Sequence, residues 1–178
     1  MPRFVAFLRG INVGSHRVKK EKLLEVFTSL GFKNVRTFKQ SGNVIFETSA
    51  TNVERIKTGI EEKLFSLLGY QVAVLLRTIQ QLQNMVESEQ FQTQNNEGTS
   101  FLVTLLPTAP PTFPLQLPLT IPKSTAEVTT FIGTEVFSVT HGGGEGALPN
   151  PFIESRLKVK ATTRNLKTIR EIVSKYSD

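Results

Sequence analysis

The order of the predicted strands and helices in the first half of the chain limits the fold more than any other feature of the sequence. Apolar residues alternate at the spacing of a strand or recur at the spacing of a helix, and glycines separate the segments. The pattern predicts, in chain order, a strand at 4–9, a helix at 18–30, strands at 35–39 and 44–46, a helix at 51–69 and a strand at 71–77. This βαββαβ order is typical of a split βαβ sandwich of the ferredoxin-like class, whose antiparallel sheet has the strand order 4-1-3-2.

The second half of the chain repeats this order loosely. Thr78 and Gln81 have the spacing of a capping box that opens a linking helix, and the polar run 87–100 predicts a loop. Beyond the loop, the pattern predicts a strand at 101–106, a hairpin at 128–139, a short helix at 151–156, an extended segment at 158–163 and a final helix. Six of the nine prolines fall between 107 and 122, which excludes an ordinary helix there.

We therefore expect an α+β protein made of two consecutive ferredoxin-like α/β sandwiches with antiparallel sheets. The expected N-terminal domain spans 1–77, the linking helix and loop span 78–100, and the C-terminal α+β domain spans 101–178. A chain of 178 residues is long enough for two small domains, each with a core of its own.

The residue types that the chain lacks exclude several classes of active site. There is no cysteine, which removes thiol catalysis, disulfides and thiolate metal sites. The two histidines, His16 and His141, and the single aspartate, Asp178, are too few for a Ser-His-Asp triad, an aspartate-built magnesium site or a histidine-rich zinc site. We predict no metal and no cofactor, and whether the protein is an enzyme stays open.

The longest early apolar run, 4–8, is too short for an export signal or a membrane-spanning helix. Because this run is short and the chain has no cysteine, we expect a cytoplasmic protein that does not enter a membrane. The sequence does not indicate an oligomeric state.

The positive charge gathers at the two ends of the chain. Residues 3–39 carry a net charge of +7 and residues 156–175 carry +6, whereas residues 40–155 carry −6, within a total of +6 that also includes the terminal Asp178. Basic segments of this kind favour an anionic partner. The alternative is that these lysines and arginines are spread over a solvated surface.

Three short blocks of sequence resemble one family of bacterial proteins. The blocks are AFLRGINVG at 6–14, QSGNV at 40–44 and ATTRN at 161–165. In this order they are similar to the family catalogued as domain of unknown function 1697, over nearly the whole chain. The resemblance implies two ferredoxin-like domains, but it implies no activity, because the role of the family is uncharacterised.

The first two blocks meet at one edge of the predicted sheet. In the order 4-1-3-2, strands 1 and 2 run the same way with strand 3 between them, so the end of strand 1 lies beside the turn at 40–43. The first helix also begins at this edge, where its free N–H groups and the positive end of its dipole attract anions. Lys19 and Lys20 in its first turn oppose the dipole, which suggests an anion between them.

Arg164 stands at the predicted start of the final helix and reaches this edge only if the second domain docks there. The candidate anion-binding residues are therefore Arg9, Asn12, Lys19, Lys20, Gln40, Ser41, Asn43, Arg164 and Asn165. The alternative is structural: glycines such as Gly10, Gly14 and Gly42 serve turns, asparagines cap them, and Arg164 pairs with a glutamate where the domains meet.

Two functions fit these observations. The first is a binding protein for a polyanion, with nucleic acid as the partner, because the ends of the chain are basic and catalytic residue types are scarce. The second is an enzyme or sensor for a small phosphorylated or carboxylated metabolite, bound at the edge formed by Arg9 and 40–43. One broad positive face would favour nucleic acid, and a narrow cleft would favour a small ligand.

Overall fold

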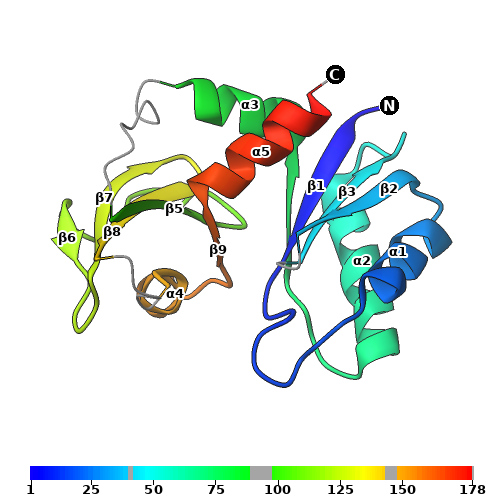
Figure 1. Ribbon diagram of the computed structural model, residues 1–178, viewed down its shortest axis with the longest axis horizontal. Helices are drawn as coiled ribbons and strands as arrows, with labels where there is room; N and C mark the ends of the chain where they lie inside the picture. Colours follow the sequence, from blue (N-terminus) through cyan, green and yellow to red (C-terminus); the bar gives the residue numbers. More distant parts are fainter. Residues whose placement is uncertain (40–41, 89–97, 143–147, 178) are drawn as a thin grey trace. The chain divides into compact units, whose positions relative to one another are not determined.

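The computed structural model describes residues 1–39, 42–88, 98–142 and 148–177. Apart from the last two residues, the chain forms two compact units, Met1–Gln83 and Asn84–Tyr176. Each unit is built on one antiparallel sheet with helices (Figure 1). The division lies inside helix α3 (Ile79–Glu87), within the segment that the sequence predicts as the link.

The first unit is a four-stranded sheet covered by two helices. Its elements are β1 (Arg3–Leu8), α1 (Lys20–Ser29), β2 (Lys33–Phe38), β3 (Asn43–Glu47), α2 (Val53–Leu68) and β4 (Val74–Thr78). The sheet has the order β2-β3-β1-β4 with every pairing antiparallel, which confirms the predicted ferredoxin-like sandwich. Helices α1 and α2 lie on the same face of this sheet (Figure 1).

The core of the first unit lies between the sheet and these two helices. The register of β1 and β3 pairs Phe4 with Phe46 and Ala6 with Val44, and all four side chains belong to the core. Phe46 stacks on Phe32 with ring centroids 4.4 Å apart. Such aromatic pairs add about 0.5–1.5 kcal/mol beyond the area that they bury, so the strands that lead to the predicted edge are firmly held.

Side-chain caps fix the starts of α2 and α3. Helix α2 is capped by Asn52, whose Oδ1 accepts from the N–H of Arg55 at 2.9 Å. The preceding Thr51 is also a favourable cap type, so residue type alone cannot choose between the two. The box at α3 is confirmed, because the N–H of Thr78 donates to Gln81 Oε1 at 2.8 Å and the N–H of Gln81 donates to Thr78 Oγ1 at 3.1 Å.

The second unit is a five-stranded antiparallel sheet. Its elements after α3 are β5 (Thr99–Leu105), β6 (Leu119–Thr120), β7 (Ala126–Ile132), β8 (Glu135–His141), α4 (Asn150–Leu157), β9 (Thr162–Asn165) and α5 (Leu166–Tyr176). The sheet order is β6-β7-β8-β5-β9. Without the short strand β6, this order repeats that of the first unit, with β5 and β8 in the central positions.

One crossover helix of the ferredoxin-like pattern is missing from the second unit. The chain passes from β5 to β7 through the proline-rich stretch and β6, with no helix between them. Proline lacks the N–H that a helix interior requires, which explains the loss. The predicted order of strand, loop, hairpin, helix, strand and helix is therefore confirmed.

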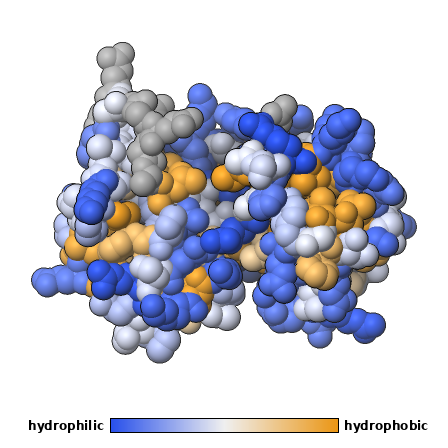
Figure 2. Space-filling model, turned by 90° about the horizontal axis from the view of Figure 1, so that it is seen from below, coloured by the Kyte–Doolittle hydropathy of each residue, from blue (hydrophilic) through white to orange (hydrophobic). Residues whose placement is uncertain are grey.

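Helix α4 closes the core of the second unit through Ile153, which packs with Val128, Val136 and Ala161. Hydrophilic residues cover most of the face shown in Figure 2, and apolar residues form smaller patches between them. Among the described residues, no helix is both long enough and apolar enough to cross a membrane.

Candidate anion-binding site

A cavity of about 670 Å³ opens at the N-terminus of α1 in the first unit. Four segments form its wall: the loop after β1, the first turn of α1, the end of β2 and the start of β3. The lining residues are Asn12, Arg17, Val18, Lys19, Lys20, Glu21, Leu23, Thr37, Lys39, Gly42 and Asn43.

Strand polarity explains why these segments meet. Strand β3 is antiparallel to both β1 and β2, so the last residues of β1 and β2 lie beside the first residues of β3. The N–H of Leu8 donates to the carbonyl oxygen of Gly42 at 2.8 Å, which joins the end of β1 to the turn before β3. Asn43 Nδ2 donates to the carbonyl oxygen of Phe38 at 3.2 Å and closes the same turn from the side of β2.

The loop between β1 and α1 is shaped by Asn12. This residue has a left-handed backbone with φ of 59°, and its N–H donates to the carbonyl oxygen of His16 at 2.7 Å. Its side-chain Oδ1 accepts from the N–H of Val18 at 2.9 Å. The ring of His16 stacks on Tyr70 with centroids 4.2 Å apart, which ties the loop to the segment that follows α2. Asn12 therefore organises the loop that carries Arg17 and Val18 to the cavity.

The cavity has a buried floor and a charged rim. Asn43 is 1% exposed, and Gly42 and Leu23 are buried as well. The side chains of the rim are exposed; they are Arg17, Lys19, Lys20, Glu21 and Lys39. Four basic residues thus face one acidic residue around a common space.

Three of the four cations at the rim are not neutralised by a neighbouring acid. Arg17, Lys19 and Lys20 form no ion pair within the part of the chain that the structure describes. Elsewhere in the same unit, Arg3 pairs with Glu47 at 2.9 Å and Lys22 pairs with Glu25 at 3.2 Å. Three cations without an acidic partner among the described residues therefore line one cavity.

The start of α1 adds to this positive charge. The N-cap residue is Lys19, which makes no capping hydrogen bond through its side chain. The backbone N–H groups of Lys20 and Glu21 donate to no described residue. Unpaired N–H groups and the dipole of the helix give its N-terminus a partial positive charge, which lysines in the first turn make less favourable. An anion in the cavity would relieve both effects.

The candidate residues read from the sequence lie in different places. Asn12, Lys19, Lys20 and Asn43 line the cavity. Arg9 is not among its lining residues, because the N–H of Arg9 donates to the carbonyl oxygen of Ala73 at 2.9 Å and the chain follows β4 at this point. The remaining two members of the first unit, Gln40 and Ser41, lie outside the described residues.

Arg164 and Asn165 belong to the second unit. The guanidinium of Arg164 donates to Thr162 Oγ1 at 2.7 Å and to the carbonyl oxygen of Thr163 at 2.9 Å. Burial lowers the pKa of Arg164 from its ordinary value of 12.5 to about 10, so the group is still a cation at neutral pH. Asn165 Oδ1 accepts from the N–H of Lys167 at 2.9 Å, which makes it the cap of α5.

Sequence reasoning did not identify Arg17, Thr37 and Lys39 as residues of the site. Thr37 is the second-last residue of β2, and Lys39 follows that strand directly with a left-handed backbone of φ 54°. Extending the edge argument from the turn to the end of the strand before it would have found both. No group of three or more histidine, cysteine, aspartate or glutamate side chains within the described residues could hold a metal ion.

Comparisons with known proteins place the chain in a family without indicating a reaction. No curated protein matches the sequence. The fold is similar to the solved structure of conserved bacterial protein SP0830 from Streptococcus pneumoniae, with a TM-score of 0.67 and 18% identity over 100% of this chain and 99% of that one. The model of the family described as protein of unknown function (DUF1697) matches residues 1–137. The match covers more than half of the sequence, and the chain therefore belongs to this family.

Proposed function

We propose that this protein is a cytoplasmic binding protein for a small anion and that the first unit holds a phosphate- or carboxylate-bearing ligand in the cavity at the N-terminus of α1. The observation that carries the proposal is the convergence of Arg17, Lys19 and Lys20, without acidic partners among the described residues, on one cavity. Hydrogen bonds from charged donors to an anion are about twice as strong as neutral ones, so this rim suits an anionic group. Within this proposal, the absence of cysteine supports the cytoplasmic location.

The distribution of charge favours a small ligand over nucleic acid. A polyanion requires basic residues spread over a broad face. In the basic segment 3–39, four of the nine lysines and arginines line the cavity, and Arg3 and Lys22 are paired with glutamates. A volume of about 670 Å³ also falls within the roughly 300–1,000 Å³ that is usual for small-molecule sites.

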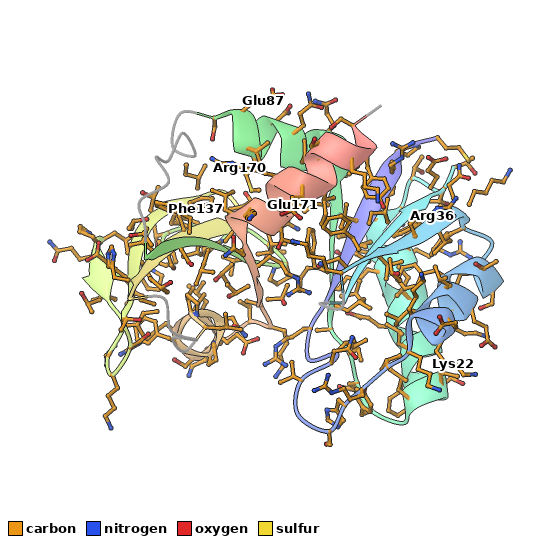
Figure 3. All side chains as sticks on the ribbon, in the orientation of Figure 1. Lys22, Arg36, Glu87, Phe137, Arg170 and Glu171 are labelled. Carbon is orange, nitrogen blue, oxygen red and sulfur yellow. The ribbon has the colours of Figure 1, made fainter. Side chains whose placement is uncertain are left out.

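The proposal is tested by calorimetric titration of the whole protein with inorganic phosphate, pyrophosphate and citrate. The test variant combines Lys19→Glu with Lys20→Glu, and the control combines Lys22→Glu with Arg36→Glu. Lys22 and Arg36 are exposed side chains of α1 and β2 that do not line the cavity (Figure 3). Both variants change the net charge by the same amount, so they separate a local site from the general field of the protein.

We expect at least one of the three anions to bind the wild type and the control, and to bind the test variant about tenfold or more weakly. Equal weakening in both variants would contradict a site at the cavity. Absence of binding by all three anions would contradict the proposal as well. Tight, salt-dependent binding of an oligonucleotide, with no binding of small anions, would favour the nucleic-acid function instead.

A further inference from the structure

The cavity is much larger than the anionic group that its rim would hold. A phosphate or carboxylate group occupies a small part of about 670 Å³, so most of the space is left for the rest of the ligand. The chemistry of that remainder is set by the lining residues that are not cations. These residues are Asn12, Val18, Glu21, Leu23, Thr37, Gly42 and Asn43.

Glu21 is the acidic residue among them. It follows Lys20 in the first turn of α1, and consecutive residues of a helix point about 100° apart, so the two side chains do not face each other. Its carboxylate makes no ion pair and no hydrogen bond with a described residue. A carboxylate in this position repels a second anionic group and accepts hydrogen bonds from hydroxyl groups. This lining suits a ligand with one anionic end and hydrogen-bond donors elsewhere.

Thr37 of β2 supplies a second polar group to the lining. It pairs with Val44 of β3, which belongs to the core on the helix-facing side, so Thr37 lies on the side of the sheet where α1 begins. Its hydroxyl forms no hydrogen bond with any described residue. A hydroxyl both donates and accepts, which matches the hydroxyl groups of a polyol better than it matches an apolar body.

No described residue of the lining has an aromatic side chain on which a nucleobase would stack. The apolar side chains among these residues are the aliphatic Val18 and Leu23. Stacking on an aromatic side chain contributes about 1–3 kcal/mol for each base, and binding sites for free bases commonly use it. A cavity walled by aliphatic, hydroxyl, amide and carboxylate groups fits a saturated, hydroxylated body.

We infer that the ligand of this cavity is a phosphate monoester of a polyol, of the sugar phosphate class, with its phosphate at the cationic rim and its hydroxyl groups on Glu21 and Thr37. This inference rests on the proposed function and narrows it. Glu21 is then a residue that determines specificity, since it accepts from hydroxyl groups and discourages ligands with two anionic ends.

The experiment compares four probes by calorimetry: inorganic phosphate, ethyl phosphate, ribose 5-phosphate and adenosine 5′-monophosphate. Ethyl phosphate has the ester but no hydroxyl groups, and the nucleotide adds a base to the sugar phosphate. We expect ribose 5-phosphate to bind about tenfold or more tightly than ethyl phosphate, with no gain from the base. In a Glu21→Ala variant, the preference for ribose 5-phosphate should disappear, while ethyl phosphate should bind equally or more tightly because a negative charge has been removed.

Glu21 is exposed, so its truncation leaves the core intact, and a thermal melt of the variant checks this. Equal affinity of ribose 5-phosphate and ethyl phosphate, tighter binding of the nucleotide, or a preference that survives Glu21→Ala would each overturn the inference. The proposed function would still stand after any of these results, provided that the variant with Lys19→Glu and Lys20→Glu bound the anionic probes more weakly than the wild type. Absence of binding by every probe would overturn the inference and the proposed function together.

Discussion

Gly42 lies in direct contact with Leu8. The N–H of Leu8 donates to the carbonyl oxygen of Gly42 at 2.8 Å, and a Cβ on Gly42 would stand 3.2 Å from the carbonyl oxygen of Leu8 and 3.3 Å from its Cβ. Gly42 also has φ of +69°, which side chains disfavour. Glycine is therefore required at this position for two reasons: the backbone is left-handed, and the turn lies too close to β1 to leave room for a side chain. This contact brings the floor of the cavity to the end of β1.

Replacing Gly42 with alanine should lower the free energy of unfolding by more than the same change at Gly69. Gly69 has a similar φ of +75°, but a Cβ there meets nothing within 4 Å. Gly69→Ala should cost about 1 kcal/mol for the backbone alone, and Gly42→Ala should cost about 1–3 kcal/mol more because buried Leu8 cannot move away. Urea denaturation of both variants measures the difference, and equal losses would show that the contact with Leu8 is not limiting.

Changes at Asn12 should separate the stability of its loop from anion binding. Asn12→Ala removes the acceptor of the Val18 N–H and places alanine in a left-handed backbone, so we expect a loss of about 1–2 kcal/mol. Asn12→Asp keeps an acceptor oxygen and tolerates the same backbone, but adds a negative charge to the cavity. Aspartate should therefore preserve most of the stability and weaken the binding of phosphate. Thermal melts and titrations of the two variants check this, and equal melting temperatures would contradict the structural role of the side chain.

The fold of the first unit could be predicted because local and long-range signals agree there. Phe4, Ala6 and Leu8 alternate as a strand requires, and the register pairs Phe4 and Ala6 with Phe46 and Val44, which alternate in the same way along β3. In the second unit, the prolines between 107 and 122 correctly excluded a helix. They could not reveal β6, because a strand of two residues has no periodicity of its own.

The sequence could predict only those residues of the cavity whose position follows from the direction of the strands. Polarity alone brings Asn12 and Asn43 to one edge, and the dipole of α1 adds Lys19 and Lys20. The position of Arg9 depends on how far the pairing with β4 continues beyond the last residue of β1, a matter of register that the sequence does not indicate. Whether a lysine lacks an acidic partner likewise depends on tertiary distances.

Removing the hydroxyl of Tyr70 should not destabilise the protein. This oxygen is buried and has no hydrogen-bond partner among the described residues, whereas the ring packs against the core and stacks on His16. An unsatisfied buried hydroxyl costs about 1–3 kcal/mol, so Tyr70→Phe should leave the melting temperature unchanged or raise it. Tyr70→Leu, which loses the stack, should lower it.

The same hydroxyl predicts a loss of stability in alkali. Burial raises the pKa of Tyr70 above its ordinary value of 10.0 in the folded protein. The unfolded chain then releases this proton at a lower pH than the folded chain, so stability is unaffected below about pH 10 and falls as the pH rises beyond it. The Tyr70→Phe variant has no such proton to release, so it should not show this loss of stability above about pH 10. Denaturation curves between about pH 8 and 11 measure it, and parallel curves for the two proteins would contradict the prediction.

The carboxylate of Glu47 predicts a loss of stability in acid. Hydrogen bonds from Asn34 Nδ2 at 2.7 Å and from Arg3 Nε at 3.0 Å lower the pKa of Glu47 below its ordinary 4.5 in the folded protein. Its contribution to stability is therefore complete above about pH 4.5 and is lost as the pH falls through the lower folded value. Wild type should be more stable than Glu47→Gln at neutral pH, and the gap should shrink in acid. A gap that does not change with pH would contradict the role of the charge.

The hydrogen bond between Thr104 and Thr163 predicts a strong coupling in the second unit. Their hydroxyl oxygens are 2.8 Å apart, Thr104 is fully buried, and the two residues face each other across β5 and β9. Thr104→Val leaves the hydroxyl of Thr163 without this partner in a buried position, which should cost about 1–3 kcal/mol. Thr163→Val should have a similar cost for the reciprocal reason.

The double variant Thr104→Val with Thr163→Val should be closer to wild type than the sum of the two single changes, because valine has nearly the shape of threonine and no polar group is then left unsatisfied. Urea denaturation of all four proteins completes the double-mutant cycle. Thr104→Ser, which keeps a hydroxyl, is the control and should lose only the packing of one methyl group. Additive losses in the cycle would show that the two hydroxyls do not depend on each other, and that β9 is held to β5 by its backbone pairing alone.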